Sequence, residues 1–205
     1  MLTRVHNRRP VRVAGFTLIE LMVALVVGLV VIGAVLALIV SIMRANQQTI
    51  QATRLTQELR ATAELINNEV RRSRGVDDPL SVAKLAAGNP FKDVTVGASC
   101  ILYAYEGGVG GNFRAIRLDG GKVVVVSAAT RAAAGCGTGG VDLTSENVVI
   151  DNLTFTAPGA PPVDRVRRIE MTITGRLANP ASDMGTITRT ITQSIFIPSV
   201  GVGST

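Results

Sequence analysis

The sequence contains no tryptophan and a single histidine, His6, which lies close to the N-terminus. Histidine is the most frequent general base at neutral pH and a common zinc ligand, so histidine-based triads are excluded downstream of His6 and zinc sites are not expected there. Aromatic residues make up only 3% of the 205 residues. Any folded core must therefore consist mainly of Val, Ile, Leu and Ala. We expect a protein that is not an enzyme and that binds no cofactor or metal.

Acidic residues are absent between Met1 and Gly15, where four arginines occur: Arg4, Arg8, Arg9 and Arg12. Without this segment the formal net charge of +6 would fall to about +2. Positive charge placed just before a hydrophobic run indicates membrane topology rather than affinity for nucleic acid, so we expect no nucleic-acid partner. The alternative, a DNA-binding role in uptake, rests on the arginines that follow the run: Arg44, Arg54, Arg60, Arg71, Arg72 and Arg74.

A run of 23 residues without charge extends from Leu21 to Met43. This length is sufficient for a membrane-spanning helix. The preceding arginines predict a cytoplasmic N-terminal side, which places the rest of the chain in the periplasm or outside the cell. An ordinary secretory signal is the alternative, because residues 34–37 resemble its small-residue cleavage site, but such signals have a shorter apolar region.

Helical periodicity continues beyond Met43, and no proline occurs between Val11 and Asp78. Apolar residues recur at spacings of three and four, which predicts an amphipathic helix; they are Ala52, Leu55, Leu59, Ala63, Ile66 and Val70. One continuous helix is expected from Phe16 to about Arg74, with Gly75 as its C-terminal stop.

Beyond Gly75 the sequence is rich in glycine, proline and short β-forming runs. Strands are predicted over residues 100–105, 113–118, 122–128, 147–155, 166–175 and 186–197, with Asp119-Gly120-Gly121 as a hairpin turn. The fold class is therefore α+β, with a long N-terminal helix packed on an antiparallel sheet. We divide the chain into a basic leader (1–15), a hydrophobic helix (16–43), its amphipathic continuation (44–75) and a β-rich domain (76–205).

The segment Gly15-Phe16-Thr17-Leu18-Ile19-Glu20-Leu21-Met22-Val23 resembles the type III signal of type IV pilins and type II secretion pseudopilins. In that family a prepilin peptidase cuts after the glycine on the cytoplasmic side and methylates the new N-terminal residue. The resemblance implies cleavage between Gly15 and Phe16 and N-methylation of Phe16. It also implies a pilin-like fold and a single-pass location in the bacterial inner membrane, with a periplasmic C-terminal domain, before the subunit enters a filament.

Glu20 is the only charged residue between Arg12 and Arg44. A charge within a membrane helix costs about 2.5–3.5 kcal/mol on insertion scales, and such residues usually serve a function and have a partner. Cleavage would create that partner, because it frees an amine on Phe16. In the family this carboxylate meets the N-terminal amine of a neighbouring subunit, so the resemblance makes Glu20 the charge that guides subunit assembly. The alternative is that Glu20 reaches the headgroup region without a specific partner.

A weaker resemblance concerns the second half of the chain. The segments 166–177 and 189–195 look like the closing strands of PilW-type minor pilins and J-type pseudopilins, and 65–71 is similar to their helix end. This implies a minor pilin in type IV pilus assembly. Its implied partners are the prepilin peptidase, other minor and major pilins, the inner-membrane assembly machinery and membrane lipid. A minor pseudopilin of type II secretion and a signal-anchored periplasmic binding or enzymatic domain are the alternatives.

Cys100 and Cys136 are the only cysteines, and both follow the membrane segment, where the compartment permits oxidation. Their spacing fits no zinc motif, so we expect a disulfide, with two free thiols as the alternative. A closed loop of about 36 residues would stabilise the fold by about 3–4 kcal/mol.

Other candidate features receive structural interpretations. The glycine-rich segment 107–111 lacks the ending of a phosphate-binding loop and is expected to be a flexible loop. A calcium site is unsupported, because the aspartates are scattered: Asp77, Asp78, Asp142, Asp151 and Asp164. Arg168, Glu170 and Arg189 are expected on a solvated sheet face. Gly28 and Gly33 either allow close helix approach or are ordinary glycines of a membrane helix.

Overall fold

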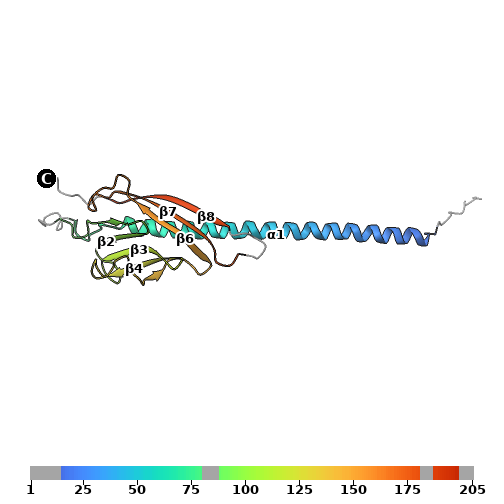
Figure 1. Ribbon diagram of the computed structural model, residues 1–205, viewed down its shortest axis with the longest axis horizontal. Helices are drawn as coiled ribbons and strands as arrows, with labels where there is room; N and C mark the ends of the chain where they lie inside the picture. Colours follow the sequence, from blue (N-terminus) through green and yellow to red (C-terminus); the bar gives the residue numbers. More distant parts are fainter. Residues whose placement is uncertain (1–14, 80–87, 181–186, 199–205) are drawn as a thin grey trace, which may run out of the picture. The chain divides into compact units, whose positions relative to one another are not determined.

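The computed structural model describes residues 15–79, 88–180 and 187–198, which form helix α1 and strands β1 to β8 (Figure 1). All strand pairs are antiparallel, and the α+β prediction is confirmed. Residues 1–14, with His6 and the four leader arginines, lie outside the described residues, as does the first residue of the predicted strand 186–197. The chain divides into a unit that ends at Gln47 and a unit that begins at Gln48.

In the first unit, α1 is apolar around its whole circumference. The helix runs from Leu18 to Arg71, two residues later at its start and three residues earlier at its end than predicted. Its large apolar side chains between Leu18 and Met43 are all exposed. This part is about 39 Å long at the helical rise, compared with about 30 Å for the hydrocarbon core of a bilayer. By length and composition the helix can cross a membrane.

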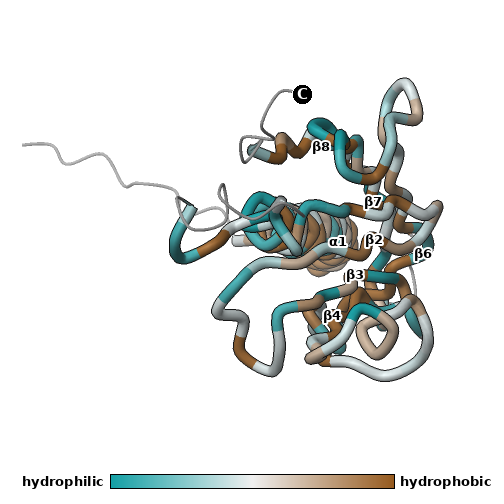
Figure 2. Tube along the Cα trace, turned by 90° about the vertical axis from the view of Figure 1, so that its left-hand side faces the viewer, coloured by the Kyte–Doolittle hydropathy of each residue, from teal (hydrophilic) through white to brown (hydrophobic). Residues whose placement is uncertain are grey.

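In the second unit, α1 buries one stripe of side chains, as the predicted periodicity requires. The buried residues of this stripe are Leu55, Leu59, Thr62, Ala63, Ile66 and Val70. Ala52, which was predicted to join it, is only half-buried. The stripe faces the two sheets, which curve around this part of the helix (Figure 2).

Helix α1 ends differently from the sequence prediction. Its last residue is Arg71, and the left-handed conformation expected of Gly75 is found at Arg74, with φ of 66°. The Arg74 side chain is buried and donates hydrogen bonds from Nε to the Lys92 carbonyl (2.6 Å) and from Nη2 to the Val163 carbonyl (3.2 Å). These contacts hold a non-glycine residue in an unfavourable conformation. Burial lowers the pKa of Arg74, although Asp164 opposes the shift.

The first sheet has the strand order β1-β2-β3-β4-β5. Its strands are β1 Thr95–Val96, β2 Cys100–Ala104, β3 Phe113–Asp119, β4 Lys122–Ala128 and β5 Val141–Asp142. Strands β3 and β4 form the predicted hairpin, closed by Asp119 opposite Lys122. Gly120 and Gly121 have φ of 54° and 79°, as a type I′ turn requires.

The second sheet has the order β6-β7-β8. Its strands are β6 Val148–Thr156, β7 Arg168–Leu177 and β8 Thr188–Phe196. A bulge interrupts the β6–β7 register between Ile150 and Asn152. The sequence predicted these three strands to within two residues at each end, but not the two-residue strands β1 and β5 or the division into two sheets.

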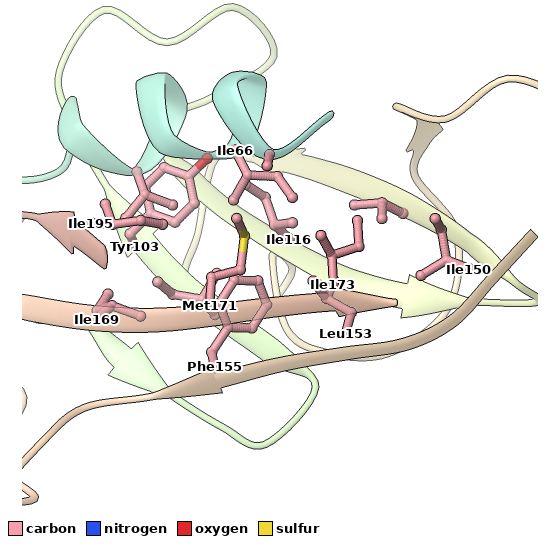
Figure 3. Close-up of a cluster of buried hydrophobic side chains, with 14 of the residues drawn as sticks. Ile66, Tyr103, Ile116, Ile150, Leu153, Phe155, Ile169, Met171, Ile173 and Ile195 are labelled. Atoms are coloured by element: carbon pink, nitrogen blue, oxygen red, sulfur yellow. The ribbon is translucent and has the colours of Figure 1, made fainter. Parts of the chain in front are cut away.

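The core lies between the buried stripe of α1 and the two sheets, and it is mainly aliphatic, as the composition requires (Figure 3). Its fully buried large side chains include Leu59, Ile66, Ile116, Leu153, Met171 and Ile173. Strand β7 approaches α1 closely at Gly175, where a Cβ atom would lie 3.1 Å from Cδ2 of Leu59. A side chain at this position would therefore separate the strand from the helix.

Both tyrosines of the chain lie near the end of α1 and stack with ring centroids 6.4 Å apart. The Tyr105 hydroxyl donates to Oε2 of Glu69 (3.2 Å), and the guanidinium of Arg72 lies 4.4 Å from the ring centroid. The Tyr103 hydroxyl is buried without a hydrogen-bond partner among the described residues. Burial raises the pKa of both hydroxyls, with Glu69 adding to the effect.

The Tyr105 hydroxyl has a hydrogen-bond acceptor and the Tyr103 hydroxyl has none among the described residues, so the matched Tyr→Phe substitutions should affect stability differently. Tyr105→Phe should lower the free energy of unfolding by about 1 kcal/mol, because it removes the hydroxyl that donates to Oε2 of Glu69, whereas Tyr103→Phe should be neutral or stabilising. Above the ordinary tyrosine pKa of about 10 the unfolded chain loses protons that the folded chain retains, so stability should fall as pH rises. Tyr103→Phe should weaken that fall. Urea unfolding of both variants at pH 7 and pH 10.5 would check these expectations.

Candidate processing and assembly site

Gly15 and Phe16 precede α1 and are fully accessible. Phe16 is 89% exposed, and a Cβ atom added to Gly15 would meet no atom within 4 Å. The fold therefore places no steric requirement for glycine at position 15. If glycine is needed there, the requirement must come from a protein that acts on this peptide bond.

Thr17 and Glu20 form a capping box at the start of α1. Thr17 accepts the first helical hydrogen bond through its carbonyl (Leu21 N, 3.2 Å), and its Oγ1 accepts a bond from the Glu20 amide (3.3 Å). In return, Oε2 of Glu20 accepts hydrogen bonds from the Thr17 amide (3.2 Å) and the Thr17 hydroxyl (3.0 Å). This reciprocal arrangement satisfies two donors that a helix N-terminus otherwise leaves unpaired.

The capping box gives the Glu20 carboxylate a partner at the start of its own helix. The carboxylate is held at the positive end of the helix dipole, which favours an anion. Only Oε2 is used by the cap, and Oε1 has no partner within the described residues. Sequence reasoning singled out Glu20 but missed Thr17, although the pattern Thr-x-x-Glu before an apolar run is a recognised cap signal.

The helix that follows offers an open apolar surface. Added Cβ atoms at Gly28 and Gly33 would meet no atom within 4 Å. Glycine is therefore not required at either position by packing within the chain, and both remain available for close approach by another helix.

Cys100 and Cys136 are joined in a disulfide with a Cα–Cα distance of 6.0 Å. The bond connects β2 to the segment that follows β4. Arg117 in β3 makes a second contact with this segment, because its buried guanidinium donates to the Gly139 carbonyl; the same guanidinium pairs with Asp119 of its own strand at 2.8 Å.

The remaining candidates have structural roles. The glycine-rich segment 107–111 lies in the loop between β2 and β3, as predicted. Its Gly111 amide donates to the Gly108 carbonyl (3.1 Å), and a Cβ at Gly111 would lie 2.1 Å from the Ala128 backbone. The part of the chain that the structure describes contains no group of three potential metal ligands. Arg168 and Glu170 form an exposed ion pair (2.7 Å) on the solvated face of β7, as expected. Arg189 is exposed but lies opposite Gly175, so it belongs to the face that carries Ile191 and Ile195 rather than to the solvated face predicted.

Comparisons with known proteins agree with this geometry. The family model of the prokaryotic N-terminal methylation motif matches residues 11–42, which include the capping box and most of the apolar part of α1. The family model of prepilin peptidase-dependent protein B matches residues 48–197, well over half of the chain. No curated protein and no solved structure matches. An apolar N-terminal helix covered by the methylation-motif match, followed by a β-rich unit that matches the second family, fits a pilin-like chain that depends on prepilin peptidase and has a helix long enough to cross a membrane. The chain therefore belongs to the prepilin peptidase-dependent protein B family and is a type IV pilin-like protein.

Proposed function

We propose that this chain is a minor pilin, a structural subunit of type IV pilus assembly with no catalytic role. Prepilin peptidase removes the leader 1–15 between Gly15 and Phe16 and methylates the new N-terminus. Residues 16–43 then anchor the subunit in the inner membrane and later pack in the filament core. The continuation of the helix, 44–75, connects this anchor to the periplasmic domain, 76–205. Family membership and the exposed cleavage segment support this sequence of events.

The observation that carries the proposal is the capped carboxylate of Glu20. The cap uses Oε2 and leaves Oε1 available at the same end of the helix. Cleavage frees an amine on Phe16, one residue before Thr17, so each processed subunit acquires a cation close to its own anion. Pairing of Oε1 with the amine of a neighbouring subunit would neutralise both charges in the membrane and fix the axial position of one helix against the next.

The leader defines the orientation. Its four arginines favour the cytoplasmic side, where the peptidase cuts, and the C-terminal unit then lies in the periplasm. The partners that follow are other minor and major pilins, the inner-membrane assembly machinery and lipid. The β7 and β8 segments resemble both PilW-type minor pilins and J-type pseudopilins, so a minor pseudopilin of a type II secretion filament is the second candidate. Co-purification with pilus or secretion subunits would decide between the two.

Substitution of Glu20 tests the pairing role. Glu20→Ala should still be inserted and cleaved, but its abundance in purified filaments should fall by about tenfold, equivalent to ~1.4 kcal/mol. Glu20→Gln is the matched control for the cap, because a carboxamide oxygen can accept from Thr17 but carries no charge. If charge pairing matters, both variants should be depleted, as measured by quantitative mass spectrometry of filament and membrane fractions.

Two results with these variants would contradict the proposed charge pairing. Wild-type abundance of both in filaments would refute a role for Glu20 in assembly. Normal incorporation of Glu20→Gln with depletion of Glu20→Ala would show that the cap, rather than charge pairing, is what the filament requires.

A further inference from the structure

The two sheets differ in how their edges are protected. In the first sheet the edge strands β1 and β5 have only two residues each. In the second sheet the outer edge of β6 is covered, because the Ile150 amide donates to the Gly121 carbonyl (2.8 Å) and the Phe155 amide donates to the Ala98 carbonyl (2.9 Å). Short or covered edges are the usual protection against pairing with other chains. Among the described residues, only the edge of β8 lacks it.

Strand β8 presents a long and regular edge. It has nine residues, no proline or lysine, and no irregularity in its pairing with β7. The Ile197 amide donates to the Arg167 carbonyl (2.8 Å), so odd-numbered residues of this strand direct their main-chain groups toward β7. The main-chain groups of Thr190, Thr192 and Ser194 therefore point to the opposite edge, where no described residue contacts them through a backbone hydrogen bond. In Figure 2, β8 lies beyond β7 with no other labelled element outside it.

The two faces of this edge have distinct chemistry. On the solvent side, hydroxyl pairs connect β7 and β8, with Thr172 and Thr192 at 3.2 Å and Thr174 and Thr190 at 2.9 Å. On the other side, Ile195 is buried and Ile191 packs against the core. Arg189 is the only charged residue of the strand. Arg189 and Gln193 lie on the same side as these isoleucines, and Nε2 of Gln193 donates to Oε1 of Glu64 (3.2 Å). A further strand would thus continue an uncharged hydroxyl face and a face on which apolar and polar residues alternate.

We propose that the free edge of β8 receives an extended segment from a different subunit of the filament, a mode of recognition in which main-chain hydrogen bonds supply affinity. The segment carries hydroxyl or β-branched residues beside Thr190 and Thr192, an apolar residue beside Ile191, and no cation beside Arg189. This inference rests on the proposed filament function.

The β8 strand of a second copy does not fit this edge. Figure 1 shows β8 running in the same direction as the adjacent C-terminal part of α1. If two copies have parallel helices, their β8 strands are also parallel to each other. To bring the two outer edges together, one copy must be rotated by half a turn about an axis along the strand. The threonine face of one copy would then lie beside the core side of the other, so an extended segment of another subunit is the better partner.

Two variants at position 192 distinguish a contact made by the main chain of β8 from a contact made by the threonine side chain. Thr192→Pro removes an outward main-chain donor that the β7–β8 ladder does not use, and proline is tolerated on sheet edges. Thr192→Val removes only the hydroxyl. With processing and melting temperature of the full chain as controls, Thr192→Pro should be about tenfold less abundant in purified filaments, and Thr192→Val should equal the wild type. Equal loss of both variants would place the contact on the threonine face and overturn the proposal.

Hydrogen exchange of the wild-type chain provides a second measurement that needs no variant. The amides of Thr190, Thr192 and Ser194 should exchange at least about tenfold more slowly in filaments than in the unassembled membrane protein. Unchanged exchange, with wild-type incorporation of Thr192→Pro, would overturn the edge proposal and leave the filament function intact. Absence of the wild-type chain from all filament fractions would instead refute the filament function and the edge proposal with it.

Discussion

Replacement of Gly15 with leucine should leave the 15-residue leader attached to every chain in the membrane. The side chain would project into open space, because no described residue beyond its chain neighbours has an atom within 4 Å of the added Cβ. The folded protein should therefore tolerate the substitution, and the loss of cleavage would report only on the peptidase. Intact-mass analysis of membrane fractions should show wild-type protein that begins at methylated Phe16 and variant protein that begins at Met1.

Gly33→Leu is the matched control, because Gly33 is equally open and lies in α1, which follows the cleavage segment. This variant should be cleaved as efficiently as the wild type. Wild-type protein with an intact Met1 terminus would refute processing, and normal cleavage of Gly15→Leu would show that the peptidase cuts elsewhere or does not require glycine.

Removal of the disulfide should produce the second large effect. The double substitution Cys100→Ser and Cys136→Ser should lower the free energy of unfolding by about 3–4 kcal/mol, because the bond closes a loop with a sequence separation of 36. Urea unfolding of the full chain in detergent, followed by circular dichroism, would measure the change. Wild-type protein treated with a reductant is the control for the buried serine at position 100, and it should lose a similar amount of stability.

The effect should also be local. Without the bond, the segment after β4 would keep the Arg117–Gly139 contact and the bond from Nη1 of Arg131 to the Asp93 carbonyl (3.1 Å). Amides in this segment should exchange faster, while those of the β6–β7 ladder should change little. An unchanged unfolding midpoint in reduced protein would contradict a stabilising role for the bond.

Much of the fold follows from local pattern. The stripe from Leu55 to Val70 has helical periodicity because a single face of α1 is buried, and Asp119-Gly120-Gly121 marks its hairpin because this turn needs positive φ. Features fixed by distant residues were not predictable in this way. The conformation of Arg74 depends on acceptors at Lys92 and Val163, and two-residue strands are too short to show periodicity.

The candidate site is encoded locally, which explains why sequence alone pointed to Gly15, Phe16 and Glu20. The roles assigned to these residues remain predictions that the processing and incorporation experiments test. The capping box is equally visible in the sequence as Thr17-x-x-Glu20, because its hydrogen bonds join residues only three apart. The open side of β8, by contrast, became apparent only once the strand order was known.

The end of α1 has a mechanical consequence. Around Arg74, hydrogen bonds lead to three separate segments: the amide donates to the Ala104 carbonyl in β2, and the guanidinium donates to the carbonyls of Lys92 and Val163. A tensile force along the helix would be shared among these hydrogen bonds, because they are loaded in parallel rather than in series. No single strand would then bear the whole force, and the last helical turn would resist being drawn out of its domain.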